Sequence, residues 1–207
     1  MKKDQDYIQD IAEMRSMMER TSKFMSLSGL SGIMAGIYAL AGAYIAYKVF
    51  DFNIDAVLFN DSPGNPSFGL LKVVLLAFVV LILSISTAMF LSWRKADRNG
   101  EKLWNASARR LVINMAVPLI TGGLLILVMI VKGMIGFVAP FTLIFYGLAL
   151  YNASKFTYEE MRSLGLIQIG LGLISSFFVE YGLLSWALGF GVIHIIYGIY
   201  MHYRYER

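Results

Sequence analysis

The amino-acid sequence predicts an all-α fold, a polytopic membrane bundle of six transmembrane helices preceded by an amphipathic N-terminal helix. First, 57% of the 207 residues are hydrophobic and only 15% are charged, whereas soluble domains have about 45–50% apolar and about 25% charged residues. Second, apolar runs of roughly the 20 residues needed to cross a bilayer alternate with polar segments. Third, all 18 Lys and Arg residues except Lys48, Lys72 and Lys132 lie in every second polar segment, which is the positive-inside pattern of membrane proteins.

Residues 4–23 have the pattern of an amphipathic helix within a cytoplasmic domain, residues 1–23. The apolar positions follow a 4-3-4 spacing and are Tyr7, Ile11, Met14 and Met18. The same heptad spacing continues into the first apolar run. One unbroken helix from residue 4 to residue 46 would therefore carry this row of contact positions from the cytoplasm into the bilayer. The alternative is a short helix on the membrane surface. Because the polar face mixes acidic and basic charges, whereas membrane-surface helices favour Lys and Arg, we expect the apolar side chains to contact a cytoplasmic protein or a second copy of the chain.

The first predicted span, residues 24–47, carries a stripe of small residues. These are Gly29, Gly32, Gly36, Ala39, Ala43 and Ala46. Lipid tails are as apolar as Leu, so membrane helices associate through small residues that let their backbones approach. We therefore expect this helix to be the packing hub of the bundle.

Five further spans complete the predicted transmembrane domain, residues 24–203, which a cytoplasmic tail, residues 204–207, follows. The second span is rich in Val, Leu and Ile and is expected to face lipid. Six spans place both termini on one side, and the charge pattern places that side in the cytoplasm. The expected boundaries are about 70–93, 111–131, 135–151, 164–179 and 183–203.

Spans three and four resemble spans five and six. The series Gly123, Gly133, Tyr146 and Gly147 returns about 50 residues later as Gly172, Gly182, Tyr197 and Gly198, which is the signature of an internal repeat. Two tandem helical hairpins would explain this similarity. Chance similarity between apolar helices is the alternative, because low-complexity sequence aligns easily.

Three polar residues inside the predicted spans are candidates for an intramembrane polar site: His194, Gln168 and Asn114. Polar groups at membrane depth are costly and often functional, and His194 would be a proton-sensitive or substrate-binding imidazole. The alternative is a neutral His194 bonded across a helix interface to Gln168, Ser175 or a tyrosine. The two amides are expected to join helices, at about 0.6 kcal/mol each.

Several kinds of site are excluded or lack a motif. The chain has no Cys, which excludes a disulfide, a thiolate metal site and a Cys nucleophile. It contains no nucleophile elbow, phosphate-binding loop or HExxH motif. The basic residues lie between apolar runs, so the lipid bilayer, and no nucleic acid, is the expected partner. We expect no catalytic residue, cofactor or metal.

Three stretches of the chain resemble a group of uncharacterised bacterial integral membrane proteins. They are MRSMMERTSKFMSLSGLSGIMAGIYALAGAYIA, ASKFTYEEMRSLG and YGLLSWALGFGVIHIIYGIYMHYRYER. The resemblance implies a bacterial inner (plasma) membrane as the location. It implies no activity, cofactor or catalytic residue.

The function expected from the sequence is that of a non-enzymatic scaffold or regulatory subunit. The heptad and the small-residue stripe favour helix–helix contacts, and the lack of catalytic groups disfavours an intramembrane enzyme. The alternative is a small-molecule transporter or channel component with a cavity near His194. The hairpin repeat, together with Pro118 and Pro140 inside the spans, favours that alternative.

Overall fold

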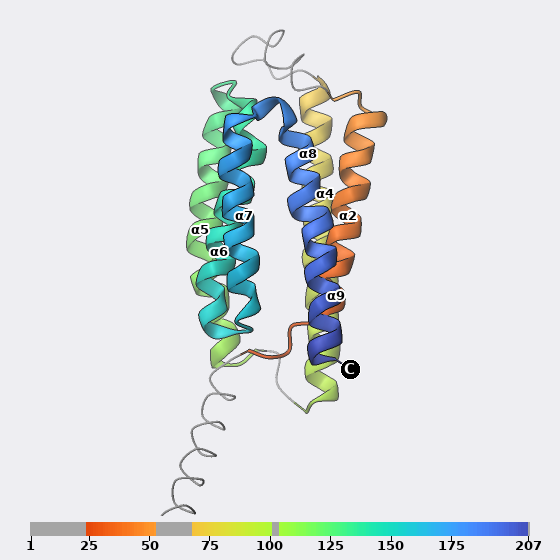
Figure 1. The fold of residues 1–207 in the computed structure, drawn as a ribbon, viewed down its shortest axis with the longest axis vertical. Helices are drawn as coiled ribbons and strands as arrows, with labels where there is room; N and C mark the ends of the chain where they lie inside the picture. The colour runs from red at the N-terminus through yellow and green to blue at the C-terminus, as the bar shows by residue number, and fades with distance from the viewer. Residues whose placement is uncertain (1–23, 53–67, 101–103, 207) are drawn as a thin grey trace, which may run out of the picture.

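The computed structural model describes residues 24–52, 68–100 and 104–206, and every regular element in these ranges is helical (Figure 1). The predicted N-terminal helix, with Tyr7, Ile11, Met14 and Met18, lies outside the described residues. Successive long helices run in opposite directions, and the last is a rod of three parts, α8, the π-helix η4 and α9. The elements are α2 (Gly29–Lys48), α4 (Phe68–Arg98), α5 (Ala106–Val131), η1 (Ile135–Phe137), α6 (Val138–Ala153), η2 (Ser154–Phe156), α7 (Glu160–Phe177), η3 (Val179–Tyr181), α8 (Gly182–Trp186), η4 (Ala187–Ile193) and α9 (His194–Tyr205).

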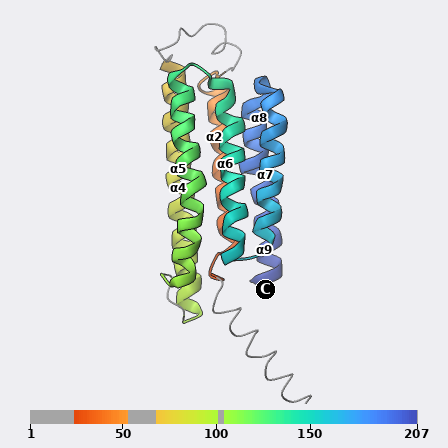
Figure 2. The ribbon, with the colours of Figure 1, turned by 90° about the vertical axis from the view of Figure 1, so that its left-hand side faces the viewer.

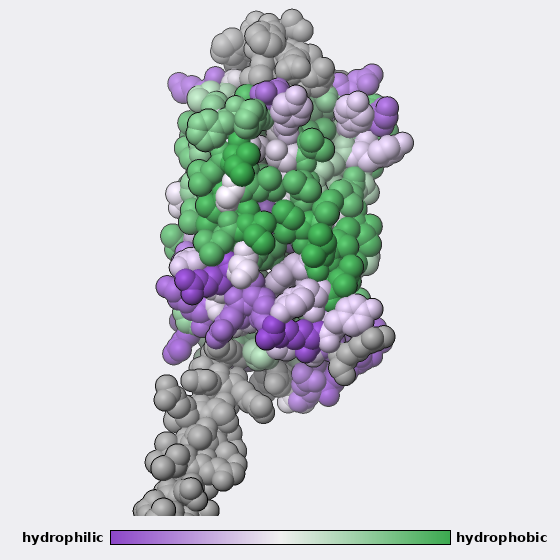
Figure 3. Space-filling model, viewed as in Figure 1, coloured by the Kyte–Doolittle hydropathy of each residue, from purple (hydrophilic) through white to green (hydrophobic). Residues whose placement is uncertain are grey.

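The helices form two layers. Figures 1 and 2 together place α5, α6 and α7 in one layer, and α4, α2 and the α8–α9 rod in the other. Helix α6 packs between α5 and α7, and α2 packs between α4 and α9. We call the end of the bundle where α2 begins and α9 ends the basal end. Figure 3 shows a broad apolar band on one face of the molecule, with polar residues below and above it.

Five stretches of the described chain are long and apolar enough to cross a membrane: 29–48, 69–98, 106–131, 135–156 and 179–205. They cover predicted spans one to four and six. The fifth predicted span corresponds to α7, which has 18 residues and is not among the five. Its Glu160, Arg162 and Gln168 lower its mean hydropathy. The molecule is therefore a helical membrane bundle with five clear candidate spans.

Backbones approach closely where α2 meets η4 and α9. A Cβ atom built on Gly29 would lie 2.5 Å from the His202 nitrogen, and one on Gly36 would lie 2.7 Å from the Gly191 oxygen. Gly32 is half-buried and faces the Gly198 Cα, 3.3 Å from such a Cβ. Since larger side chains here would force the helices apart, this pair needs its small residues. The buried part of α2 comprises Gly29, Ser31, Gly36, Ala39, Gly42, Ala43 and Ala46.

A second close pair, α6 with α7, was not singled out from the sequence. A Cβ atom on Gly147 would lie 2.6 Å from the Gly165 oxygen, and one on Gly172 would lie 2.8 Å from the Pro140 oxygen. The two layers thus each contain one glycine-mediated helix pair. Packing of this kind holds α7, the least apolar long helix, against α6.

The start of α2 corrects the prediction of one unbroken helix through the first span. Residues 24–28 are not helical, and α2 begins at Gly29 after an extended Ser28 (φ −97°, ψ 134°). The physical reason is competition for backbone hydrogen bonds. The Phe24 nitrogen donates to the Phe156 oxygen at 2.7 Å, and the Thr157 hydroxyl donates to the Phe24 oxygen at 2.7 Å. We call residues 24–28 the strap.

Candidate functional site

His194 is the centre of a buried polar cluster in the middle of the bundle. Its side chain is only 5% exposed. The Nδ1 atom lies 2.8 Å from the Gly189 oxygen, and the Nε2 atom lies 2.8 Å from the Tyr146 hydroxyl. Because a carbonyl can only accept, Nδ1 must carry hydrogen, and Nε2 of the neutral ring then accepts from Tyr146. The backbone geometry thus selects one tautomer of His194.

The Gly189 oxygen lies in a π-helix. Residues Ala187–Ile193 form the π-helical turn η4, a rare element that is frequent at functional sites. The Gly189 oxygen also accepts from Gln168 Nε2 at 2.7 Å. Gly189 itself must be small, since a Cβ atom there would lie 2.4 Å from Leu143 Cδ2 and 2.7 Å from Gln168 Oε1. Gln168 and His194 therefore share one backbone acceptor, the Gly189 oxygen.

Aromatic rings cover this cluster. Phe190 stacks on His194 with ring centroids 5.8 Å apart and an 18° angle between the rings. The Tyr146 and His194 centroids are 5.3 Å apart, and Trp186 follows beyond Phe190 at 5.2 Å. Residues 186, 190 and 194 are four apart and so share one helix face. The rings keep the imidazole in an apolar setting in which its hydrogen bonds are strong.

The three predicted polar residues do not form one site. Gln168 is fully buried, and its Nε2 atom lies 3.4 Å from His194 Nδ1, beside the Gly189 oxygen that accepts from both. Asn114 instead donates to the Arg110 oxygen of its own helix at 2.8 Å. This bond lies within one helix, as is common for polar side chains in helices, and the role of Asn114 in joining helices stays a prediction. Tyr146 completes the cluster; sequence reasoning anticipated a tyrosine but not which one.

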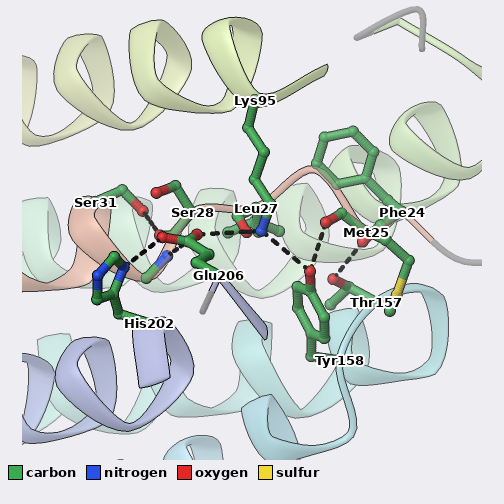
Figure 4. Close-up of polar contacts among 11 residues, drawn as sticks. Phe24, Met25, Leu27, Ser28, Ser31, Lys95, Thr157, Tyr158, His202 and Glu206 are labelled. Carbon is green, nitrogen blue, oxygen red and sulfur yellow. Dashed lines mark hydrogen bonds and ion pairs between the residues drawn. The ribbon is translucent and has the colours of Figure 1, made fainter. Parts of the chain in front are cut away.

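A second polar cluster, which we call the basal clamp, is built on Glu206 (Figure 4). One carboxylate oxygen accepts from the Gly29 nitrogen at 2.8 Å and from Lys95 Nζ at 3.1 Å, and the other contacts His202 Nδ1 at 2.7 Å. Lys95 also donates to the Leu27 oxygen at 2.8 Å. The clamp therefore joins α4, α9 and the first amide of α2, a group that no intrahelical partner can satisfy.

The strap is held by the turn between α6 and α7 as well as by the clamp. The Tyr158 hydroxyl donates to the Met25 oxygen at 2.5 Å, beside the Thr157 bond to the Phe24 oxygen (Figure 4). Ser26 is fully buried. The Phe24 ring packs with Ala108, Leu111 and Ala153. The strap thus contacts both layers of the bundle.

The surroundings of Glu206 in the clamp shift the pKa of its carboxyl. Burial raises the pKa of its carboxyl, but hydrogen bonds from His202, Gly29 and Lys95, with the positive charge of Lys95, outweigh burial and lower the pKa below its ordinary value. The negative charge is also favourable beside the N-terminus of α2. The clamp is therefore ionic at neutral pH.

The fold and these clusters define the class of the molecule, a polytopic helical membrane protein. No protein-family model, no curated protein and no solved structure matches the chain. The resemblance to bacterial inner-membrane proteins accordingly stays a prediction. Within residues 24–52, 68–100 and 104–206, no group of three or more His, Cys, Asp and Glu side chains could hold a metal ion.

Proposed function

We propose that the protein is a non-enzymatic membrane scaffold or regulatory subunit that engages a partner through residues 1–23, next to the strap at the basal end. The observation that supports this proposal is the strap, which leads directly into that segment. A flexible linker would be exposed and bonded mainly to water. The strap instead is tied by hydrogen bonds to Lys95 of α4 and to residues 156–158 at the turn between α6 and α7. Each bond contributes about 0.5–1.5 kcal/mol, and more where Lys95 takes part.

A fixed attachment point is useful when a contact outside the membrane must be coupled to the bundle. Pulling or turning residues 1–23 would act first on the strap, and through it on Lys95 and Tyr158. These side chains belong to different layers, so a partner could sense or change how the layers pack. The partner would be a cytoplasmic protein or a second copy of the chain.

We also propose six spans with both termini in the cytoplasm of a bacterium. Helix α7 runs alongside the candidate spans over much of their length (Figure 1), and its polar Gln168 points inward. Described Lys and Arg residues at the far end of the bundle are Lys48, Lys72 and Lys132, whereas those at the basal end are Arg94, Lys95, Arg98, Arg109, Arg110, Lys155, Arg162 and Arg204. This asymmetry supports a cytoplasmic basal end.

The tandem repeat of hairpins is part of the same proposal. Both hairpins turn at the far end through a 3₁₀ turn, η1 in one and η3 in the other. Their second helices carry Gly147 and Gly198, and each of these glycines faces the backbone of a neighbouring helix. Equivalent turns and equivalent contact glycines are what a duplicated hairpin would retain.

The alternative of a small-molecule pathway with a cavity at His194 has less support. Both ring nitrogens of His194 bond to protein atoms. A surface pocket of about 530 Å³ lies instead at the basal turn between α6 and α7, lined by Tyr151, Ser154, Lys155, Glu159 and Arg162.

The scaffold proposal is tested in native membranes with the full chain, a deletion of residues 4–20 and the variant Tyr158→Phe. We expect the deletion to change the oligomeric state or the set of co-purifying proteins, and Tyr158→Phe to weaken the same association. Tyr44→Phe, which removes a hydroxyl from a side chain that is 65% exposed, is the matched control. If the folded deletion variant keeps the same oligomeric state and partners, the proposal is wrong.

The topology is tested with single cysteines, since the chain has none. Arg109→Cys should react with a membrane-impermeant thiol reagent only from the cytoplasmic side, and Lys132→Cys only from the outside. The opposite pattern would invert the proposed orientation. Reaction of both from one side would contradict the proposed number of spans between them.

A further inference from the structure

The surface pocket of about 530 Å³ lies at the basal turn that joins α6 to α7. Pockets of about 300–1,000 Å³ commonly hold small molecules. Neither the basal clamp nor the His194 cluster contributes a residue to this pocket. Its lining comes from both sides of the turn: Tyr151 from the end of α6, Ser154 and Lys155 from η2, Glu159 from the residue before α7, and Arg162 from the first turn of α7.

Within the described part of the chain, the two cations of the pocket have no anionic partner. Lys155 and Arg162 are both exposed, and the ion pairs among the described residues include neither of them. The Arg162 guanidinium lies over the Tyr151 ring, 5.5 Å from its centroid. A cation–π contact of this kind holds the guanidinium in place without neutralising its charge. Both cations are therefore available to an anion.

The charges of the lining suit one phosphodiester. Lys155 and Arg162 contribute two positive charges and Glu159 contributes one negative charge, so the lining carries one net positive charge. A phosphodiester carries one negative charge. An arginine can bind phosphate oxygens through two parallel N–H bonds, and a lysine binds phosphate as a point charge. We expect the phosphate to contact Lys155 and Arg162 and to avoid the Glu159 carboxylate.

The position of the pocket favours a lipid over a soluble phosphate compound. The turn between α6 and α7 lies at the basal end, and polar residues border the apolar band there (Figures 1 and 3). Leu166 and Leu173 follow Arg162 at spacings of four and eleven residues, which place all three on one face of α7. Both leucines are exposed. An acyl chain that extends from a headgroup at Arg162 would cover these leucines, whereas a soluble phosphate would leave them uncovered.

We propose that this pocket binds the headgroup of an anionic phospholipid, whose phosphodiester contacts Lys155 and Arg162. Basic pockets between transmembrane helices bind anionic headgroups in this way. The inference does not rest on the scaffold function, because it uses no residue of the strap or of residues 1–23. It does not rest on the proposed orientation either, since the basal end borders a leaflet of the bilayer in both orientations.

The test is native mass spectrometry of the purified full chain, titrated in detergent with phosphatidylglycerol or with phosphatidylcholine of the same acyl chains. We expect the anionic phosphatidylglycerol to bind more tightly than the zwitterionic phosphatidylcholine. The double variant Lys155→Gln/Arg162→Gln should bind phosphatidylglycerol about tenfold more weakly, because each exposed charge contact contributes up to about fivefold. Arg98→Gln is the matched control, since Arg98 is an exposed basal cation of α4 that does not line the pocket.

Glu159→Gln should have the opposite effect. It removes the negative charge of the lining and should strengthen the binding of phosphatidylglycerol by up to about fivefold. A variant that gains affinity is folded, so this result cannot arise from unfolding. Weaker binding in Glu159→Gln would contradict the proposed arrangement of charges and overturn the site.

The remaining outcomes also decide the proposal. Equal binding of phosphatidylglycerol in the wild type and the double variant would overturn it. Equal losses in the double variant and in Arg98→Gln would also overturn it, because the lipid would then associate with the basal surface and not with this pocket. Glycerophosphoglycerol, the same headgroup without acyl chains, serves as a competitor. If it displaces the lipid at equal concentration, the site takes a soluble phosphodiester and the assignment to a lipid is wrong.

Discussion

The two polar clusters of this bundle use different physical means at different depths. The His194 cluster is uncharged, covered by aromatic rings and bonded through the Gly189 carbonyl and the Tyr146 hydroxyl. The basal clamp pairs Lys95 with Glu206 at side-chain exposures of 18% and 13%. Charges are costly at membrane depth but are tolerated near the interface, where water screens them. The middle of the bundle is therefore stabilised by close packing and uncharged hydrogen bonds, and the basal end by an ion pair.

The largest effect is expected from Gly189→Ala in the His194 cluster. The new Cβ atom would meet Leu143 and Gln168 at the distances given above, so we expect a loss of about 2–3 kcal/mol of unfolding free energy. Gly170→Ala on α7 is the matched control, because nothing lies within 4 Å of its Cβ position. Thermal unfolding in detergent measures both. Equal stability of the two variants would show that η4 can adjust to a larger side chain. Close packing at Gly189 would then not determine the stability of this region.

A smaller effect is expected from Lys95→Met in the basal clamp. The substitution leaves the largely buried Glu206 carboxylate without its cation, which should cost about 2 kcal/mol. Arg94→Met, the exposed neighbour on α4, should change stability by less than about 0.5 kcal/mol. The Lys95 effect should also weaken with added salt, unlike that of Gly189→Ala. A salt-independent loss would contradict the ionic account of the clamp.

Tyr146→Phe tests the contribution of a single uncharged hydrogen bond in the His194 cluster. The ring and its packing remain, but His194 Nε2 loses its donor, so we expect a loss of about 1 kcal/mol. This cost should be insensitive to salt. The control is Tyr44→Phe, whose hydroxyl is on an exposed side chain. A cost equal to that of the control would mean that water replaces the phenol, which would itself favour hydration of the cluster.

The smallest effect is expected from the pH response of the clamp. The folded pKa of Glu206 is lowered from its ordinary 4.5, so its contribution to stability is present above that pH and is lost as the pH falls through the lower folded pKa. Unfolding temperatures of the wild type and of Glu206→Gln should therefore converge in acid. The variant should lack this part of the pH dependence. An unchanged gap between them in acid would contradict the assigned role of Glu206.

The sequence was less informative about α7 than about the other long helices, because α7 is less apolar. Hydropathy and length suit a helix that faces lipid, and α4 and α5 are of this kind, with many exposed large apolar side chains. Helix α7 pairs with α6 through Gly147 and Gly165 and turns Gln168 toward Gly189 of η4. The structural roles of its glycines and of Gln168 can be assigned only when the elements packed against α7 are known.

The sequence by itself determined the helical class, the clear spans and the use of small residues in α2, because the bilayer imposes length, hydropathy and close packing on each helix separately. Only the tertiary structure decided three further features. Helix α2 begins after the non-helical strap, η4 is a π-helix, and Tyr146 is the partner of His194. Thr157 and Phe24, for example, are 133 residues apart. A backbone group that bonds to a distant segment leaves no local periodicity in the sequence, so such contacts appear only when the chain is folded.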